Sequence, residues 1–196
     1  MIYYIVYFLT KVVSWLFFPF STYQTSNIPR KGAFILASNH ASYLDPVVLG
    51  ICSVRRINFM AKIELFKGAL GFVLTRLGAF PVKRGEADLG AMKEALKRLK
   101  NGRVILIFVE GTRRIGNQPS RAQPGAGFLA MKSGVSVVPV FVQGTDHVLP
   151  RGAKFFKRGR VFATFGEPFS VSDASSYEEA SGRILDKIYA LAPKPF

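Results

Sequence analysis

The chain has 196 residues, of which 49% are hydrophobic, and 27 Lys and Arg residues against 12 Asp and Glu give it a formal net charge of +15. The chain has a single cysteine, which excludes a disulfide framework. One cysteine and two histidines are also too few for a structural zinc site. This length suits one domain with its own core. The excess of cations favours anionic partners, and the mean hydropathy of +0.22 favours a membrane among them.

The N-terminal segment, residues 1–20, is almost wholly apolar and aromatic, interrupted by Lys11 and Ser14. A bilayer span needs about 20 apolar residues, and Tyr and Trp favour the headgroup region. The segment lacks the basic start and the small-residue cleavage site of a signal peptide. We therefore expect a membrane-anchoring helix, monotopic or barely spanning, that ends at Pro19. The alternative is a buried core helix.

A polar linker at 21–31 precedes an apolar run at 33–37, which is long enough for a buried strand. The sequence Asn-His-Ala-Ser-Tyr-Leu-Asp-Pro follows at 39–46, and we expect a helix from Pro46, because Asp is a favoured N-cap and Pro a favoured first residue. The apolar surroundings of Cys52 favour packing over a nucleophilic role.

His40 and Asp45 are the first candidate catalytic residues. Five residues rotate by about 140° on a regular helix, so the two side chains cannot share a helical face. On a loop that runs into a helix they can meet, and the carboxylate then orients and polarises the imidazole, as in acyl-transfer chemistry. The alternative is that Asp45 only caps the helix and His40 is only a polar loop residue.

The remaining pattern alternates strands with helices, which predicts a single α/β domain, residues 21–196, with a mixed, largely parallel central sheet flanked by helices. A helix ending at Gly78 has an apolar face broad enough to touch either the core or lipid. Pro139 predicts an edge strand or a bulge. We expect strands at 57–61, 103–109, 135–142 and 161–165, an extended run at 78–85, helices ending at Gly102 and spanning 125–133, and a last helix opened by a capping box of Ser176 and Glu179.

A second polar motif, Glu110-Gly111-Thr112-Arg113, follows the buried strand at 103–109. Open α/β sheets place ligands at the carboxyl ends of their strands. Arginine suits bidentate recognition of phosphate, glycine lets a backbone approach closely, and threonine offers a hydroxyl. The alternative is a surface turn with a Glu–Arg ion pair.

Together, Asn-His-x4-Asp and Glu-Gly-Thr-Arg resemble the glycerolipid acyltransferase family, most closely its bacterial 1-acyl-sn-glycerol-3-phosphate acyltransferases. Two looser blocks, Phe80–Arg84 and Val138–Val140, resemble the family's phosphate-binding block and the apolar block after it. The resemblance runs from about residue 27 to about residue 168. The family usually has Phe-Pro before Glu-Gly-Thr-Arg and Ser after it, where this chain has Phe-Val and Arg114.

The resemblance implies that His40 is the general base, which takes the proton of the acceptor's hydroxyl as that oxygen attacks an acyl thioester, and that Asp45 holds the imidazole. It implies no covalent acyl-enzyme on Ser42, no metal and no cofactor beyond the acyl donor. The residues implied to hold the lysophosphatidate head are Lys83, Arg84, Glu110, Gly111, Thr112 and Arg113, with the two arginines facing its phosphate.

The expected partners are therefore lysophosphatidate, converted to phosphatidate, an acyl carrier protein or coenzyme A thioester, and anionic lipids at the cytoplasmic face of the cell membrane. One alternative keeps the chemistry but takes another lysophospholipid or glycerol 3-phosphate. A remote alternative is a non-catalytic, basic membrane-binding protein. Nucleic acid is not an expected partner, because the aromatic residues lie inside apolar runs rather than among the cations.

Overall fold

The computed structural model describes residues 2–83, 88–113 and 121–193. Within these residues one seven-stranded sheet has the order β1-β7-β6-β2-β5-β3-β4. Every neighbouring pair is parallel except β6 and β7. The predicted α/β fold with a mixed, mainly parallel sheet is thus confirmed. The strands are β1 (Phe20–Tyr23), β2 (Phe34–Ser38), β3 (Ile57–Lys62), β4 (Ala79–Val82), β5 (Val104–Phe108), β6 (Val137–Gln143) and β7 (Val161–Phe165).

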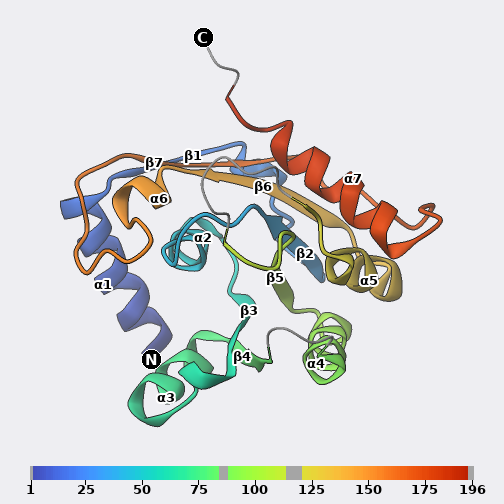
Figure 1. Cartoon of the computed structure of the whole chain (residues 1–196), viewed down its shortest axis with the longest axis horizontal. Helices are drawn as coiled ribbons and strands as arrows, with labels where there is room; N and C mark the ends of the chain where they lie inside the picture. Colours follow the sequence, from blue (N-terminus) through green and yellow to red (C-terminus); the bar gives the residue numbers. More distant parts are fainter. Residues whose placement is uncertain (1, 84–87, 114–120, 194–196) are drawn as a thin grey trace.

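Helices cover both faces of the sheet (Figure 1), and α5 and α7 lie side by side on one of them. Short 3-10 turns occupy Thr25–Asn27 and Ile63–Leu65. The helices are α1 (Ile2–Phe17), α2 (Asp45–Cys52), α3 (Gly68–Leu77), α4 (Leu89–Lys100), α5 (Pro124–Ser133), α6 (Thr145–Val148) and α7 (Tyr177–Tyr189).

Two apolar cores lie on opposite faces of the sheet, because successive side chains of a strand point to opposite sides. In β2, Phe34 and Leu36 join the core shared with α2, whereas Ile35 and Ala37 join the core shared with α4, α5 and α7. All five residues of β2 are buried. An unbroken apolar run is what a central parallel strand requires, so β2 and β5 fall where the sequence predicts them.

Strand β6 bears out one of the two alternatives predicted at Pro139, the bulge. It lies between β7 and β2, so the expectation of an edge strand was wrong. A break in the pairing does occur there. Val137 of β6 forms a bridge with Phe169, and the Gly166 N–H donates to the Pro139 carbonyl over 2.8 Å. The partner segment therefore advances three residues while β6 advances two, beside a residue that has no N–H to donate.

Strand β1 is absent from the prediction, which assigns residues 20–23 to the end of the N-terminal segment and the start of a linker. It pairs in parallel with β7 at the edge of the sheet. Its four residues alternate between half-buried and exposed. An alternation over four residues is too short to stand out from a polar linker.

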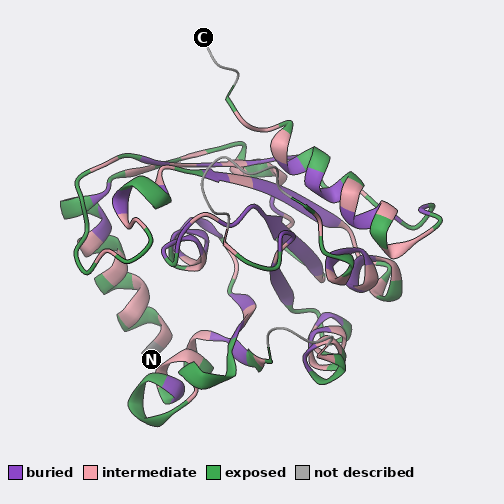
Figure 2. Ribbon diagram, viewed as in Figure 1, coloured by how far each residue is buried: buried purple, intermediate pink, exposed green. Residues whose placement is uncertain are grey.

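Helix α1 packs on α2 and α3 and turns Tyr7 and Val13 toward the core. Its opposite face is apolar and exposed, with Trp15 at 77% and Tyr4 at 73% accessibility, so it is not a buried core helix (Figure 2). Helix α3 likewise exposes Leu70 and Phe72. Among the residues that the structure describes, no helix is both long and apolar enough to cross a membrane.

Cys52 is buried at the end of α2, and burial raises the pKa of its thiol to about 12. Since the ordinary value is 9.0, its thiolate fraction near pH 8 is about 1,000-fold lower than that of an exposed thiol. We expect the folded protein to react with a thiol reagent at pH 8 far more slowly than the denatured protein, followed by absorbance. Rapid labelling of the folded chain would contradict this assignment to the core.

Candidate active site

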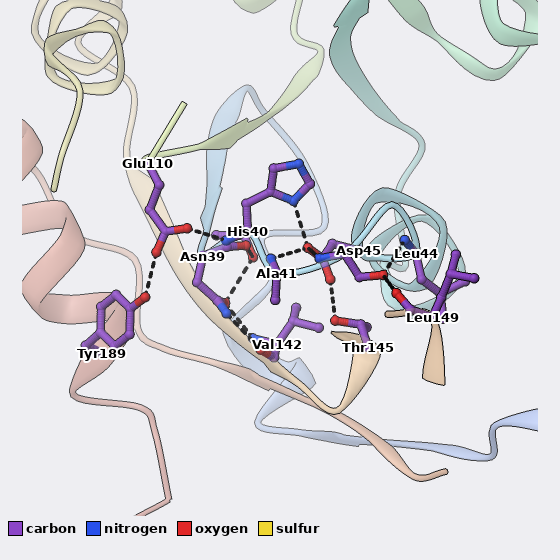
Figure 3. Close-up of polar contacts among 12 residues, drawn as sticks. Asn39, His40, Ala41, Leu44, Asp45, Glu110, Val142, Thr145, Leu149 and Tyr189 are labelled. Atoms are coloured by element: carbon purple, nitrogen blue, oxygen red, sulfur yellow. Dashed lines mark hydrogen bonds and ion pairs between the residues drawn. The ribbon is translucent and has the colours of Figure 1, made fainter. Parts of the chain in front are cut away.

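The loop at residues 39–44 joins β2 to α2, and a side chain ties it to the neighbouring strand (Figure 3). The Asn39 amide donates to the Val142 carbonyl and accepts from the Val142 N–H, each over 2.8 Å. Asn39 thus continues the pairing of β2 with β6 after the strand itself has ended. The residue that follows it, His40, is therefore held by the sheet.

His40 and Asp45 meet across this loop, with Nδ1 and Oδ2 2.7 Å apart. Asp45 has no exposed surface and His40 only 5%. The same carboxylate oxygen accepts from the backbone N–H groups of Ala41 and Ser42, over 2.7 and 2.8 Å. The two side chains that the sequence pairs are therefore brought together as predicted.

The alternative in which Asp45 only caps α2 was wrong. Asp45 is the first residue of α2, not the residue before it, and Leu44 in the cap position makes no side-chain cap. The carboxylate turns back toward the preceding loop. The helix also begins one residue earlier than the expected start at Pro46.

The second oxygen of the Asp45 carboxylate accepts from the Thr145 hydroxyl over 2.5 Å. Thr145 is fully buried in α6, one hundred positions further along the chain. Both carboxylate oxygens are thus fixed by donors. A carboxylate can only accept, so Nδ1 of His40 carries the proton between them, and in the neutral ring Nε2 is the acceptor.

The imidazole is also held by its face. It stacks on Phe108 with the ring centroids 3.9 Å apart and the planes 16° from parallel. Among the described residues Nε2 has no hydrogen-bond partner, and Figure 3 shows that nitrogen pointing away from the residues drawn. An oriented ring with one free nitrogen is the arrangement that a general base needs.

Glu110 connects the second motif to the first. Its carboxylate accepts from the His40 backbone N–H over 2.9 Å and from the Tyr189 hydroxyl over 2.5 Å. The residue is 8% exposed. Glu110, which the resemblance assigns to the substrate, therefore links the loop at residues 39–44 to α7 in this structure.

Arg113 reaches the same loop by a different contact. Its guanidinium carbon lies 3.5 Å from the centroid of the Tyr43 ring, which is 65% exposed. The alternative of a Glu110–Arg113 ion pair is not what forms. Cation–π contact with an exposed ring leaves the guanidinium N–H groups available for an anion.

Gly111 has a positive φ of 69°, a conformation that favours glycine. A Cβ at this position would lie 2.9 Å from Cγ of Gln123. The glycine thus allows the chain after β5 to turn sharply and lie close to the segment before α5. This explains the small residue between Glu110 and Thr112.

A cavity of about 760 Å³ opens where two strands separate. β3 and β5 pair only as far as Phe59, while β3 and β4 stay paired to Lys62 and Val82. The predicted site residues that line it come from both sides of the gap: Lys83, Glu110, Gly111 and Thr112. His40 and Asp45 do not line it, but it adjoins them through Phe108 and Glu110. Arg84 lies outside the described residues.

Asp88 fixes the backbone of Lys83 at this cavity. Its carboxylate accepts from the Lys83 N–H over 2.8 Å and caps α4 through the Ala91 N–H over 2.9 Å. These two backbone hydrogen bonds, that of Lys83 first, lower the pKa of the Asp88 carboxyl. One carboxylate thus fixes both the Lys83 backbone and the first turn of α4.

Three positioning residues were missed from the sequence. Asn39 belongs to the first motif but had no assigned role, whereas Thr145 lies after the strand expected at 135–142 and was assigned to no element. Tyr189 neighbours the buried stripe of the last helix. Nothing in the local sequence marks Thr145 or Tyr189, because both act on residues far away in the chain.

Residues 20–143 match the protein-family model described as Acyltransferase. A 1-acyl-sn-glycerol-3-phosphate acyltransferase of Bacillus subtilis is 32% identical over 153 residues, which cover 77% of this chain and 74% of that protein. A chloroplastic enzyme of the same name from Arabidopsis thaliana is 28% identical over 159 residues, covering 79% of this chain and 44% of its own. The crystal structure of the 1-acyl-sn-glycerophosphate acyltransferase of Thermotoga maritima superposes with a TM-score of 0.82 at 30% identity, covering 95% of this chain and 76% of that one.

The Thr145 contact can be tested by stability. Thr145→Val keeps the shape of the side chain but leaves one oxygen of the buried Asp45 carboxylate without its donor. We expect a loss of about 1–3 kcal/mol in the free energy of unfolding, measured by denaturant titration. Thr75→Val, at an exposed hydroxyl in α3, is the control and should change it by less than about 0.5 kcal/mol. Equal effects would contradict a special role for Thr145.

Proposed function

The chain belongs to the acyltransferase family, and from this premise we propose that it transfers a fatty acyl group from an acyl thioester to the sn-2 hydroxyl of lysophosphatidate, giving phosphatidate. The observation that carries the proposal is the contact of 2.7 Å between His40 and Asp45, next to the cavity that holds the second motif. The names of its relatives support lysophosphatidate as the acceptor.

In the proposed mechanism His40 is the general base. Asp45 holds the Nδ1 proton, so Nε2 accepts the proton of the acceptor's hydroxyl as that oxygen attacks the thioester carbonyl carbon. The carbon–sulfur bond then breaks, and the thiolate takes the proton from the imidazolium. General-base catalysis of this kind contributes about 10²–10⁴-fold to the rate.

The acyl group passes directly to the acceptor in this proposal. Ser42 is the nearest hydroxyl in the loop, but it is 1% exposed and donates to the Leu149 carbonyl over 2.9 Å. Its hydroxyl is thus used to fix the loop and is closed off from a substrate. No metal or cofactor is needed, because a thiol with a pKa near 8.5 is a good leaving group.

The glycerophosphate head is proposed to bind in the cavity that opens where β3 separates from β5. Lys83, Gly111 and Thr112 line it, and Arg113 follows Thr112 in the chain and lies over the Tyr43 ring of the catalytic loop. We assign the phosphate to Arg113 and Arg84, since guanidinium groups bind phosphate in a bidentate manner. Glu110 contributes by positioning the His40 backbone. The donor is an acyl thioester of acyl carrier protein or coenzyme A.

Residues 1–20 are proposed to hold the remaining domain, residues 21–196, at the cytoplasmic face of the cell membrane. The exposed side chains of α1 recur at helical spacing and include aromatic rings suited to the headgroup region. The acceptor lipid lies in that same layer. The net charge of +15 attracts both the anionic membrane and the anionic substrates.

His40→Ala tests the mechanism. We expect turnover of lysophosphatidate, measured by release of the donor's thiol, to fall by at least about 100-fold, because the oriented imidazole that accepts the hydroxyl proton is removed. His147→Ala removes the second, exposed histidine and should leave turnover unchanged. Near-normal turnover of the His40 variant would refute the assignment. A panel of lysophosphatidate, another lysophospholipid and glycerol 3-phosphate separates the acceptors.

Trp15 is the only tryptophan of the chain, and it lies on the exposed face of α1. On addition of phospholipid vesicles we expect its fluorescence to shift to shorter wavelength and its quenching by iodide to decrease, because the indole enters the headgroup region. Vesicles without protein are the blank. If the protein sediments with vesicles while Trp15 remains as accessible to iodide as before, α1 is not the anchor.

A further inference from the structure

The connection between α6 and β7, residues 149–160, forms a strongly basic and partly aromatic surface that we call the basic loop. It contains five cations and no acidic residue. Phe155 is 82% exposed and Phe156 40% exposed, among the charges. The cations, all exposed, are Arg151, Lys154, Lys157, Arg158 and Arg160.

The basic loop is joined by a backbone hydrogen bond to the end of α6 and packs against the end of α1. The Lys157 N–H donates to the Val148 carbonyl over 2.8 Å, which brings the two ends of the turn together. The Phe156 ring contacts those of Phe17 and Phe18, with centroids 6.2 and 5.6 Å apart. The loop therefore lies beside the carboxyl end of α1 (Figure 1), and both segments are largely exposed (Figure 2).

We propose that the basic loop is a binding site for an anionic phospholipid bilayer, separate from α1, in which its cations contact lipid phosphates and Phe155 enters the headgroup layer. A large apolar ring held at 82% exposure between cations matches a surface that is anionic outside and apolar within. Continuity with the exposed apolar face of α1 places both segments against one surface.

An acidic protein such as an acyl carrier would also match the charge of the basic loop. It would not account for the apolar face of α1 that the loop extends, because a small acidic partner presents no apolar surface of that extent. The bilayer accounts for both features at once. The two occupants are separated by the experiments below.

The position of the basic loop connects bilayer binding to the site. The loop begins at Leu149, whose carbonyl accepts from the Ser42 hydroxyl, and it follows α6, which carries Thr145. Both contacts hold the segment between His40 and Asp45. The segment that carries the basic loop is therefore attached to the catalytic loop at Leu149.

The test uses the full chain and vesicles of neutral lipid alone or with anionic phosphatidylglycerol. In the loop variant Lys154, Lys157 and Arg158 are replaced by Gln. In the control variant the same replacement is made at the exposed Lys93, Lys97 and Lys100 of α4. Each cation near an anionic leaflet contributes about five-fold to affinity, so the loop variant should lose on the order of 100-fold on anionic vesicles. The loss of affinity for anionic vesicles should be several-fold smaller in the control variant. The affinity of the loop variant for neutral vesicles should not change. Equal losses in the two variants would overturn the proposal.

Phe155→Ser supplies a second readout. Because the Phe155 side chain is largely exposed, we expect this variant to fold as the wild type does. We expect roughly tenfold weaker binding to both kinds of vesicle, because the apolar insertion is lost. Turnover with detergent-dispersed lysophosphatidate should stay at the wild-type level, so failure of vesicle binding is distinct from failure of the acyl-transfer reaction. If the loop variant instead raises the KM for an acyl carrier protein thioester and binds vesicles normally, the basic loop is a protein-docking site and the proposal is wrong.

Discussion

A buried carboxylate needs donors on both of its oxygens, and the architecture around Asp45 follows from this requirement. Leaving such a group without partners costs several kcal/mol, so the segments that supply the donors are held in place together. They are the loop after β2, which gives His40 and two backbone N–H groups, and α6, which gives Thr145. The two segments lie next to each other only because β2 and β6 are neighbours in the sheet. The geometry of the His40–Asp45 pair therefore depends on the order of the central strands.

Glu110 provides the second connection of the same kind. It follows β5, on the other side of β2, and its carboxylate holds the His40 backbone from that side. The loop that carries His40 is thus fixed from β6 by Asn39 and from β5 by Glu110. The separation of β3 from β5 then leaves a cavity next to a rigid loop, which keeps the cavity and His40 in fixed relative positions.

The sequence was sufficient for much of the fold and for the central pair of the site. Buried strands such as β2 and β5 are unbroken apolar runs, and their ends carry the two motifs. It was not sufficient to decide what Asp45 does, since capping a helix and orienting a histidine use the same residue type at the same place. The sequence could not predict the roles of Thr145 and Tyr189, because their hydrogen-bond partners are 100 and 79 positions away in the chain. Strand β1 is defined by its pairing with β7 and not by a pattern of its own.

The hydrogen bond from Tyr189 to Glu110 has a consequence for how the protein is made. Chains are synthesised from the amino end and tend to fold as they emerge. The apolar face of α1 is therefore complete long before the ribosome adds α7, which closes the network behind His40. A nascent chain therefore exposes the apolar face of α1 first and completes the contacts around His40 last, so that face is available to a partner before the site has its final geometry.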